Sequence, residues 1–243
     1  MVIEPRRLLT VHLLIIAGLV LANVPIAVMD ALGHYSLYGY SRLLRLEEEA
    51  NLPSVFSALA LLACAVAAFA NRSRLAPDDP DRSAWGLLTA FFAFLALDEA
   101  AMLHELANRI SADLDLDGTL TNLGVFVYVP ITIWLAVRLL RFWLRQDRGL
   151  RTALLAGTAI YGAAAFGFEL VENQLLSAGF GPHDLPLRIS FTFEESGEML
   201  AVAVFLYAFL RHFSTMGGGP LIAFMVQGER AGSDQPGLRD SGG

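Results

Sequence analysis

The chain has 243 residues, of which 55% are hydrophobic and 17% are charged, and its formal net charge is -7 at neutral pH. An ordinary soluble domain carries about 25% charged residues, so this composition excludes that class and favours a membrane protein. The 17 basic residues are all arginines scattered along the chain, which excludes a nucleic-acid-binding protein because such a protein needs a basic face.

Six apolar stretches follow one another along the chain, and each predicts a transmembrane helix, which needs roughly 20 mostly apolar residues. They cover residues 8–29, 54–70, 85–107, 120–143, 152–176 and 189–213. The first is too long for a signal peptide, and residues 21–27 make a poor cleavage site. The only cysteine, Cys64, lies inside the second stretch and predicts a packing role. We therefore expect an all-α polytopic membrane bundle of about six transmembrane helices over residues 1–215.

Arginine placement predicts the orientation of these helices, because short cytoplasmic loops retain positive residues. One side of the predicted bundle holds Arg6, Arg7, Arg72, Arg74, Arg82, Arg138, Arg141, Arg145, Arg148, Arg151, Arg211, Arg230 and Arg239. The other side holds only Arg42, Arg45, Arg109 and Arg188, with acidic stretches at residues 47–49 and 113–117. Both termini are therefore predicted in the cytoplasm. The complete absence of lysine is typical of a GC-rich bacterial gene, so we expect a multi-pass protein of the bacterial cytoplasmic membrane.

Two segments lie outside the predicted spans. Residues 30–52 form an outer-side loop, and within it residues 41–52 mix leucines with arginines and glutamates, a pattern typical of an amphipathic helix. Such a helix would lie at the outer interface, or alternatively form a lid over the bundle. Residues 216–243 are polar and glycine-rich, and predict a disordered cytoplasmic tail.

Ionisable residues within the apolar stretches carry the functional signal. The third stretch contains Asp98, Glu99, His104 and Glu105, the fifth contains Glu169 and Glu172, and the sixth contains Glu194, Glu195 and Glu198. A charged residue in the bilayer centre costs about 2.5–3.5 kcal/mol even on insertion scales, so such residues are usually retained for function. With the predicted orientation all three sets fall in the outer half of the bilayer, which predicts one shared site.

Helical spacing favours convergence of these acids. In a continuous helix Asp98 and Glu105 are seven residues apart and nearly superimpose, with Glu99 and His104 flanking them. Glu169 and Glu172 share a face, and the three acids of the sixth stretch lie within an arc of roughly 100°.

So many carboxylates cannot all be ionised in a low-dielectric site without added positive charge. Either some are protonated, as in a proton relay, or one or two divalent cations are bound, and we favour the cations. Oxygen-rich ligation with at most one imidazole suits Fe, Mn or Zn. The predicted metal ligands are Asp98, His104, Glu105, Glu169, Glu172, Glu194 and Glu198, and Glu195 and Glu99 are the predicted proton-transfer residues.

Simpler roles remain open for several of these residues. Glu99 and Glu172 could reach outward to water, and His104 could lie at the headgroup level. Asn173 and Arg188 could support the site from outside the ligand shell or anchor the helices at the interface.

The predicted set of metal ligands resembles that of ferritin-like di-iron carboxylate bundles in its chemistry only. Their Glu-x-x-His motif is missing, because Met102 and Asn108 stand three residues after Glu99 and Glu105.

Three function classes follow. The first is a metal-dependent membrane enzyme that acts on a lipid or another apolar substrate, in which the metal activates water for hydrolysis or a pair of irons activates oxygen. The second is a proton- or cation-coupled transporter or channel. The third is a structural subunit whose acids pair with arginines of a partner that the sequence does not identify. We prefer the enzyme, because the inner halves of the stretches carry no ionisable residue that would continue a path to the cytoplasm.

Overall fold

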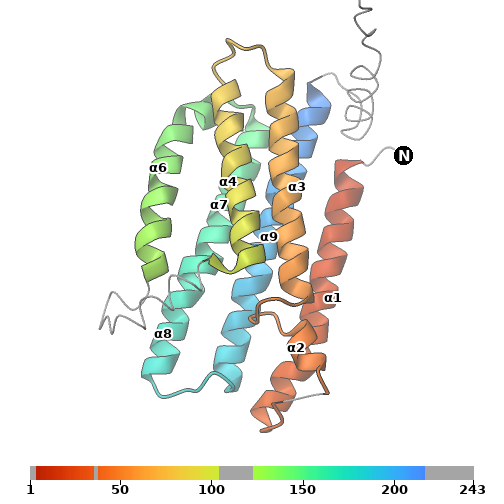
Figure 1. The fold of residues 1–243 in the computed structure, drawn as a ribbon, viewed down its shortest axis with the longest axis vertical. Helices are drawn as coiled ribbons and strands as arrows, with labels where there is room; N and C mark the ends of the chain where they lie inside the picture. Colours follow the sequence, from red (N-terminus) through yellow and green to blue (C-terminus); the bar gives the residue numbers. More distant parts are fainter. Residues whose placement is uncertain (1–3, 36–37, 104–122, 217–243) are drawn as a thin grey trace, which may run out of the picture.

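The computed structural model describes residues 4–35, 38–103 and 123–216, and these residues form helices and no strand. In chain order the elements are α1 (Pro5–Ala31), α2 (Tyr40–Leu44), α3 (Leu52–Arg74), α4 (Arg82–Ala101), α6 (Leu123–Arg145), α7 (Arg148–Gly162), the π-helix η2 (Ala163–Phe168), α8 (Glu169–Ser177) and α9 (Leu185–Thr215). Figure 1 shows the long helices side by side as one bundle. The prediction of an all-α fold is confirmed.

Within the part of the chain that the structure describes, four helical stretches are long and apolar enough to cross a membrane: Pro5–Ala31, Leu52–Arg74, Arg82–Ala101 and Arg148–Ser177. The last of these runs through α7, η2 and α8 as one continuous helical path. These four apolar helices indicate a membrane protein. The remaining two long helices, α6 and α9, coincide with the other two apolar stretches of the sequence.

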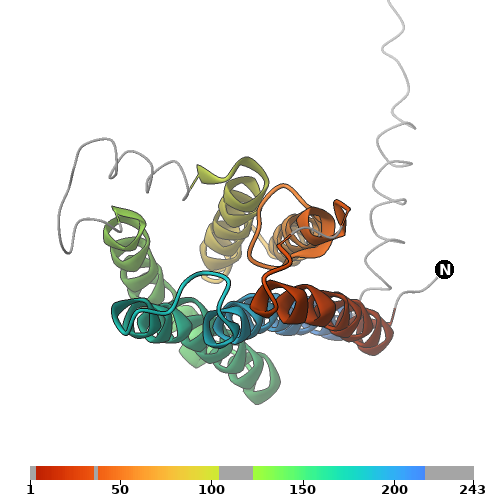
Figure 2. The same cartoon turned by 90° about the horizontal axis from the view of Figure 1, so that it is seen from below.

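Helix α9 lies at the centre of the packing, where it contacts α1, α3 and α7 together with η2, and α3 pairs along its length with α4. Figure 2, which looks along the bundle, shows α9 beside α1 on one flank and beside α7 and α8 on the other. The buried core near the end of α9 is aromatic, since Trp85 contacts Phe142 and Phe209 edge-on at ring-centroid distances of 5.4 and 5.3 Å. Rings at this spacing pack more favourably than their buried area alone implies.

Small residues let α9 approach its neighbours closely. A Cβ atom added to Gly197 of α9 would lie 2.8 Å from the Cβ of Ala164 in η2, and one added to Gly157 of α7 would lie 2.8 Å from the Phe205 ring. Glycine at these positions therefore determines how closely α9 can approach η2 and α7.

Helix α4 ends earlier than the sequence predicts. Its last residue is Ala101, and Met102 has the left-handed φ of 54°, which ends the regular helix. The prediction of one unbroken helix to Ala107 is therefore wrong at Met102, and the expected superposition of Asp98 and Glu105 rested on that continuity. His104 and Glu105 themselves lie outside the described residues.

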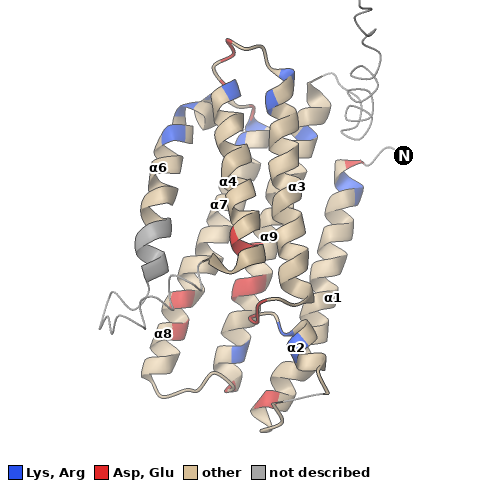
Figure 3. Cartoon of the chain, in the orientation of Figure 1, with Lys and Arg blue, Asp and Glu red and all other residues tan. Residues whose placement is uncertain are grey.

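Charged residues are distributed unevenly along the bundle, as Figure 3 shows. Arginines gather at the end where α3 ends and α4 begins, whereas the acidic turns of α4, α8 and α9 lie between the middle of the bundle and its opposite end. The acids of three helices therefore share one half of the molecule.

Candidate functional site

A cavity of about 40 Å³ lies between α3, α4, α7 and α9 in this half of the bundle. Four carboxylates line it, two from α4 and two from α9: Asp98, Glu99, Glu195 and Glu198. The rest of its described wall consists of Phe56, Ser57, Ala60, Leu61, Leu95, Tyr161, Met199 and Val202. A cavity of this size has room for a few water molecules, or for a cation with part of its hydration shell.

Tyr161 of α7 brings a hydroxyl group into this cavity. Its hydroxyl group lies close to Glu198, and it is near enough to Glu99 and Glu195 to interact electrostatically with both. The sequence analysis did not select Tyr161, because a tyrosine in an apolar helix has no distinguishing pattern. Tyr161 can hold or pass a proton at Glu198.

Three further carboxylates form a second group between α8 and α9. The carboxyl groups of Glu172 and Glu194 lie close enough to interact strongly, and Glu169 lies near both. Two carboxyl groups this close can form a hydrogen bond only when one of them carries a proton. Glu172 is 8% exposed, and its Oε1 atom has no hydrogen-bond partner among the described residues.

Glu194 joins the two groups, because it interacts electrostatically with Glu198 as well as with Glu172. The structure thus brings seven predicted site residues into one series along α4, α9 and α8: Asp98, Glu99, Glu195, Glu198, Glu194, Glu172 and Glu169. Within the described ranges, no group of three or more His, Cys, Asp or Glu side chains is already arranged to hold a metal ion. The predicted metal ligation of these residues therefore stays a prediction.

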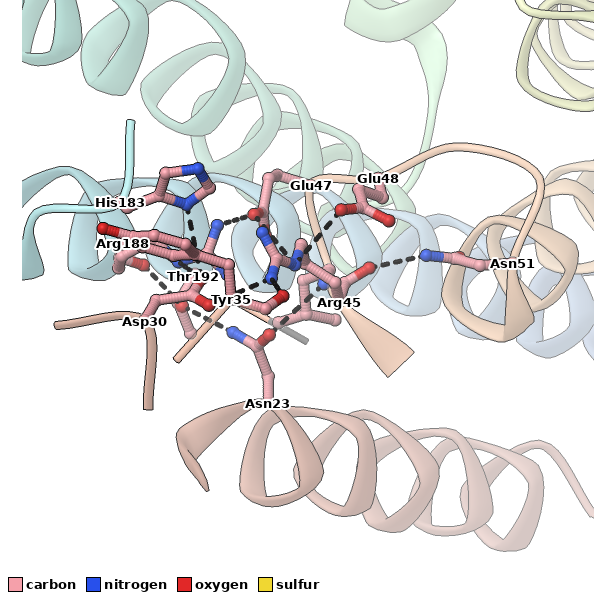
Figure 4. Close-up of polar contacts among 11 residues, drawn as sticks. Asn23, Asp30, Tyr35, Arg45, Glu47, Glu48, Asn51, His183, Arg188 and Thr192 are labelled. Carbon is pink, nitrogen blue, oxygen red and sulfur yellow. Dashed lines mark hydrogen bonds and ion pairs between the residues drawn. The ribbon is translucent and has the colours of Figure 1, made fainter. Parts of the chain in front are cut away.

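The two residues predicted to support the site differ in placement. Asn173 is exposed on α8. Arg188 is 2% exposed and belongs to a separate ionic network at the start of α9, which Figure 4 shows.

This network joins α1, the loop of residues 45–51 and α9 through two buried arginines. Asp30 at the end of α1 lies between them, with its Oδ1 3.1 Å from Nη2 of Arg45 and its Oδ2 3.2 Å from Nε of Arg188. Glu47 forms an ion pair with Arg188 and lies 3.9 Å from Arg45, and Glu48 lies 3.2 Å from Arg45. Charges of both signs are thus paired within one buried cluster.

Neutral groups complete the same network. Asn23 donates a hydrogen bond to the Thr192 hydroxyl at 2.9 Å, and its side-chain oxygen accepts one from the Leu46 amide at 3.4 Å. His183 approaches Asp30 at 3.8 Å and packs on the Tyr35 ring. These contacts fix the end of α1 against the start of α9 (Figure 4).

Sequence reasoning missed this network because it assigned Arg45 and the acids of residues 47–49 to a surface segment. In the structure α2 has only five residues, and Arg45 and Leu46 after it are 5% and 3% exposed. One signal could have indicated pairing: Asp30 and Arg188 stand at the ends of two apolar stretches that the predicted orientation places on the same side.

Comparison with known families gives one match. The family model described as "Domain of unknown function (DUF8692)" matches residues 8–213, which is most of the chain. Searches of curated proteins and of solved structures find no match.

Proposed function

The chain belongs to the DUF8692 family, and from its carboxylate cavity we propose that it is a metal-dependent membrane enzyme that acts on a lipid or another apolar substrate. The site takes one or two divalent ions, Fe, Mn or Zn, in the outer half of the bilayer.

The proposal includes six transmembrane helices with both termini in the cytoplasm of a bacterial cell. Helices α6 and α9 supply the two spans beyond the four apolar stretches, and the alternating directions of the helices in Figure 1 are compatible with this count. The arginine-rich end of the bundle in Figure 3 supports a cytoplasmic assignment of that end. The acid-bearing half then faces the outside.

The observation that carries the proposal is the lining of the cavity. Four carboxylates from two helices line a space of about 40 Å³. Like charges this close in a low-dielectric site repel strongly. A divalent cation offsets this repulsion and explains why the acids converge.

The residues divide into two roles under this proposal. Asp98 and Glu198 ligate the metal from the cavity wall, and Glu194, Glu169 and Glu172 extend the ligand set toward α8. Predicted ligands His104 and Glu105 lie outside the described residues and remain part of the proposed set. Glu195 and Glu99 transfer protons to and from the water that the metal activates.

Elemental analysis of the detergent-purified chain tests the metal, after a chelator has removed loosely bound ions. We expect a stoichiometric metal in the wild type and its loss in Glu198→Gln and Glu169→Gln, which remove a ligand charge without changing side-chain size. Glu4→Gln is the matched control, because Glu4 is exposed and its carboxylate pairs with Arg7 at the start of α1. A folded wild type without metal, or full metal in both site variants, would refute the proposal.

One observation favours a second function, a proton-coupled transporter. The carboxyl groups of Glu172 and Glu194 lie close together, so without a metal they would share a proton, and intramembrane acids of this kind serve as proton relays. In this case metal-free protein in liposomes would collapse an imposed proton gradient, and Glu194→Gln would abolish the effect. Gradients that persist with wild-type protein would exclude this function.

A further inference from the structure

We propose that the loop of residues 45–51 is an ionic latch that closes the carboxylate cavity at the end where α9 begins and that supplies Glu49 as an additional acid of the site. The role of Glu49 rests on the proposed metal site, whereas the latch does not.

The latch is the salt-bridged contact of Arg45 and Glu47 with Asp30 and Arg188. Arg45 and Arg188 are 5% and 2% exposed, so water competes little for these ion pairs. Removal of one partner from a buried pair leaves an uncompensated charge, which strongly favours any state that lets water in. The loop is therefore fixed to α1 and α9 by charges that oppose its detachment.

The next residue of the loop packs on the cavity wall. Leu46 is buried in a cluster with Ile16 and Leu19 of α1 and Met199 and Ala203 of α9, and Phe56 packs against this cluster. Met199 and Phe56 also line the cavity. Detachment of the loop would therefore remove side chains that support the cavity lining.

The far end of the loop is fixed as well. Asn51 caps α3 by accepting a hydrogen bond from the Ser54 amide at 3.1 Å, and its amide group donates to the Arg45 carbonyl at 2.6 Å. Ala50 has a φ of 56°, a left-handed conformation that is unfavourable for alanine and persists only where the surroundings impose it. Both ends of the segment that carries Glu49 are thus held.

Glu49 lies near the acids of α9. Its charge interacts with that of Glu195, which lines the cavity, and Figure 3 shows the acidic loop before α3 beside the acidic turn of α9. Glu48, the preceding residue, has a side chain that is 42% exposed and contacts Arg45 instead. Glu48 and Glu49 therefore have different contacts, and Glu48 is the matched control for Glu49 in a test of metal binding.

The latch can be tested by measuring how fast a water-soluble reagent reaches the cavity. Ser57 lines the cavity, so Ser57→Cys in a Cys64→Ala background reports entry of a charged methanethiosulfonate reagent into the full-length protein in detergent. We expect labelling at least about tenfold faster when Arg188→Gln or Glu47→Gln is added, because each removes a partner from the buried ion pairs that fix the loop to α9. Glu4→Gln, at the start of α1, should leave the rate unchanged.

Equal labelling rates in the latch-intact protein and in folded Glu47→Gln protein would overturn the latch. Glu47→Gln keeps both arginines, so it decides the question even if Arg188→Gln does not fold.

Metal affinity tests Glu49. Titration of metal-depleted protein with Mn²⁺ should show a dissociation constant raised by about 10- to 100-fold in Glu49→Gln, the usual effect of removing a group that supports a metal site, and unchanged in Glu48→Gln. Equal affinities in the two variants would remove Glu49 from the site. A wild type that binds no Mn²⁺ would refute both the metal proposal and the role of Glu49, while the labelling result would still decide the latch.

Discussion

Charged residues inside the bundle fall into two kinds that differ in their balance of sign. Around Asp30, two arginines meet several carboxylates, and the opposite charges neutralise one another. Around Glu195 and Glu198, four of the described residues that line the cavity are acids. A cluster of oppositely charged pairs can have a purely structural role. A cluster of carboxylates needs bound protons or a cation to reduce the repulsion between its members. This contrast separates the latch from the candidate site.

The close packing of α9 against η2 depends on Gly197. Gly197→Ala should lower the free energy of unfolding by about 1–3 kcal/mol, because the added methyl group would overlap the side chain of Ala164. Denaturation midpoints in mixed detergent micelles would measure the change. Gly18→Ala in α1 is the matched control, since no other described residue comes within 4 Å of its added Cβ. Equal midpoints for the two variants would contradict the close packing.

The helical path from α7 through η2 to α8 determines which face of α8 meets α9. The six-residue π-helix Ala163–Phe168 directly precedes Glu169, and π-segments of this kind occur frequently at functional sites. It changes the helical register, so the face that α8 presents to α9 differs from the face expected for an uninterrupted α-helix. Glu172 meets Glu194 on that face.

Deletion of Ala165 tests the register. It should convert the π-helix to α-helix and rotate α8 by roughly 100° relative to α7, which separates Glu172 from Glu194. With Cys64→Ala as background, a short bismaleimide should join Glu172→Cys to Glu194→Cys in the undeleted chain and fail after the deletion. Gly157→Cys with Phe205→Cys is the control. Gly157 precedes the π-helix, so this pair should react both with and without the deletion. Equal cross-linking of the first pair would show that η2 does not set the register.

Element positions were largely predictable, because apolar length and turn residues are local properties. Each of the six apolar stretches coincides with a helical region, within a few residues at most ends. The exceptions depend on tertiary contacts: the end of α4 at Ala101, the π-helix, and the inward path of residues 45–51. The acids of α4 and α9 were correctly expected to lie together, whereas Tyr161 and the Asp30 network could be recognised only from packing.

At the scale of the whole molecule, the proposed topology places the turn before α9 outside the cell and the turn between α3 and α4 inside. Two exposed prolines mark these turns, Pro182 and Pro77. In a Cys64→Ala background, a membrane-impermeant maleimide should label Pro182→Cys in intact cells and Pro77→Cys only after permeabilisation. The reverse pattern would invert the proposed orientation, and labelling of both in intact cells would refute the six-span count.

The length of α9 bears on which bond of a substrate could reach the cavity. Its 31 residues rise about 46 Å, slightly more than a bilayer with its headgroups. Arg188 near the helix start then lies at headgroup depth, and Glu194–Glu198 lie only about 14–20 Å from that start. The headgroup region is about 5–8 Å thick on each side, so these acids lie within the outer half of the hydrocarbon core. Under the proposed function, a lipid that keeps its ordinary position in the outer leaflet would present to these acids the bonds of its acyl chains, and not the ester or ether linkages above them.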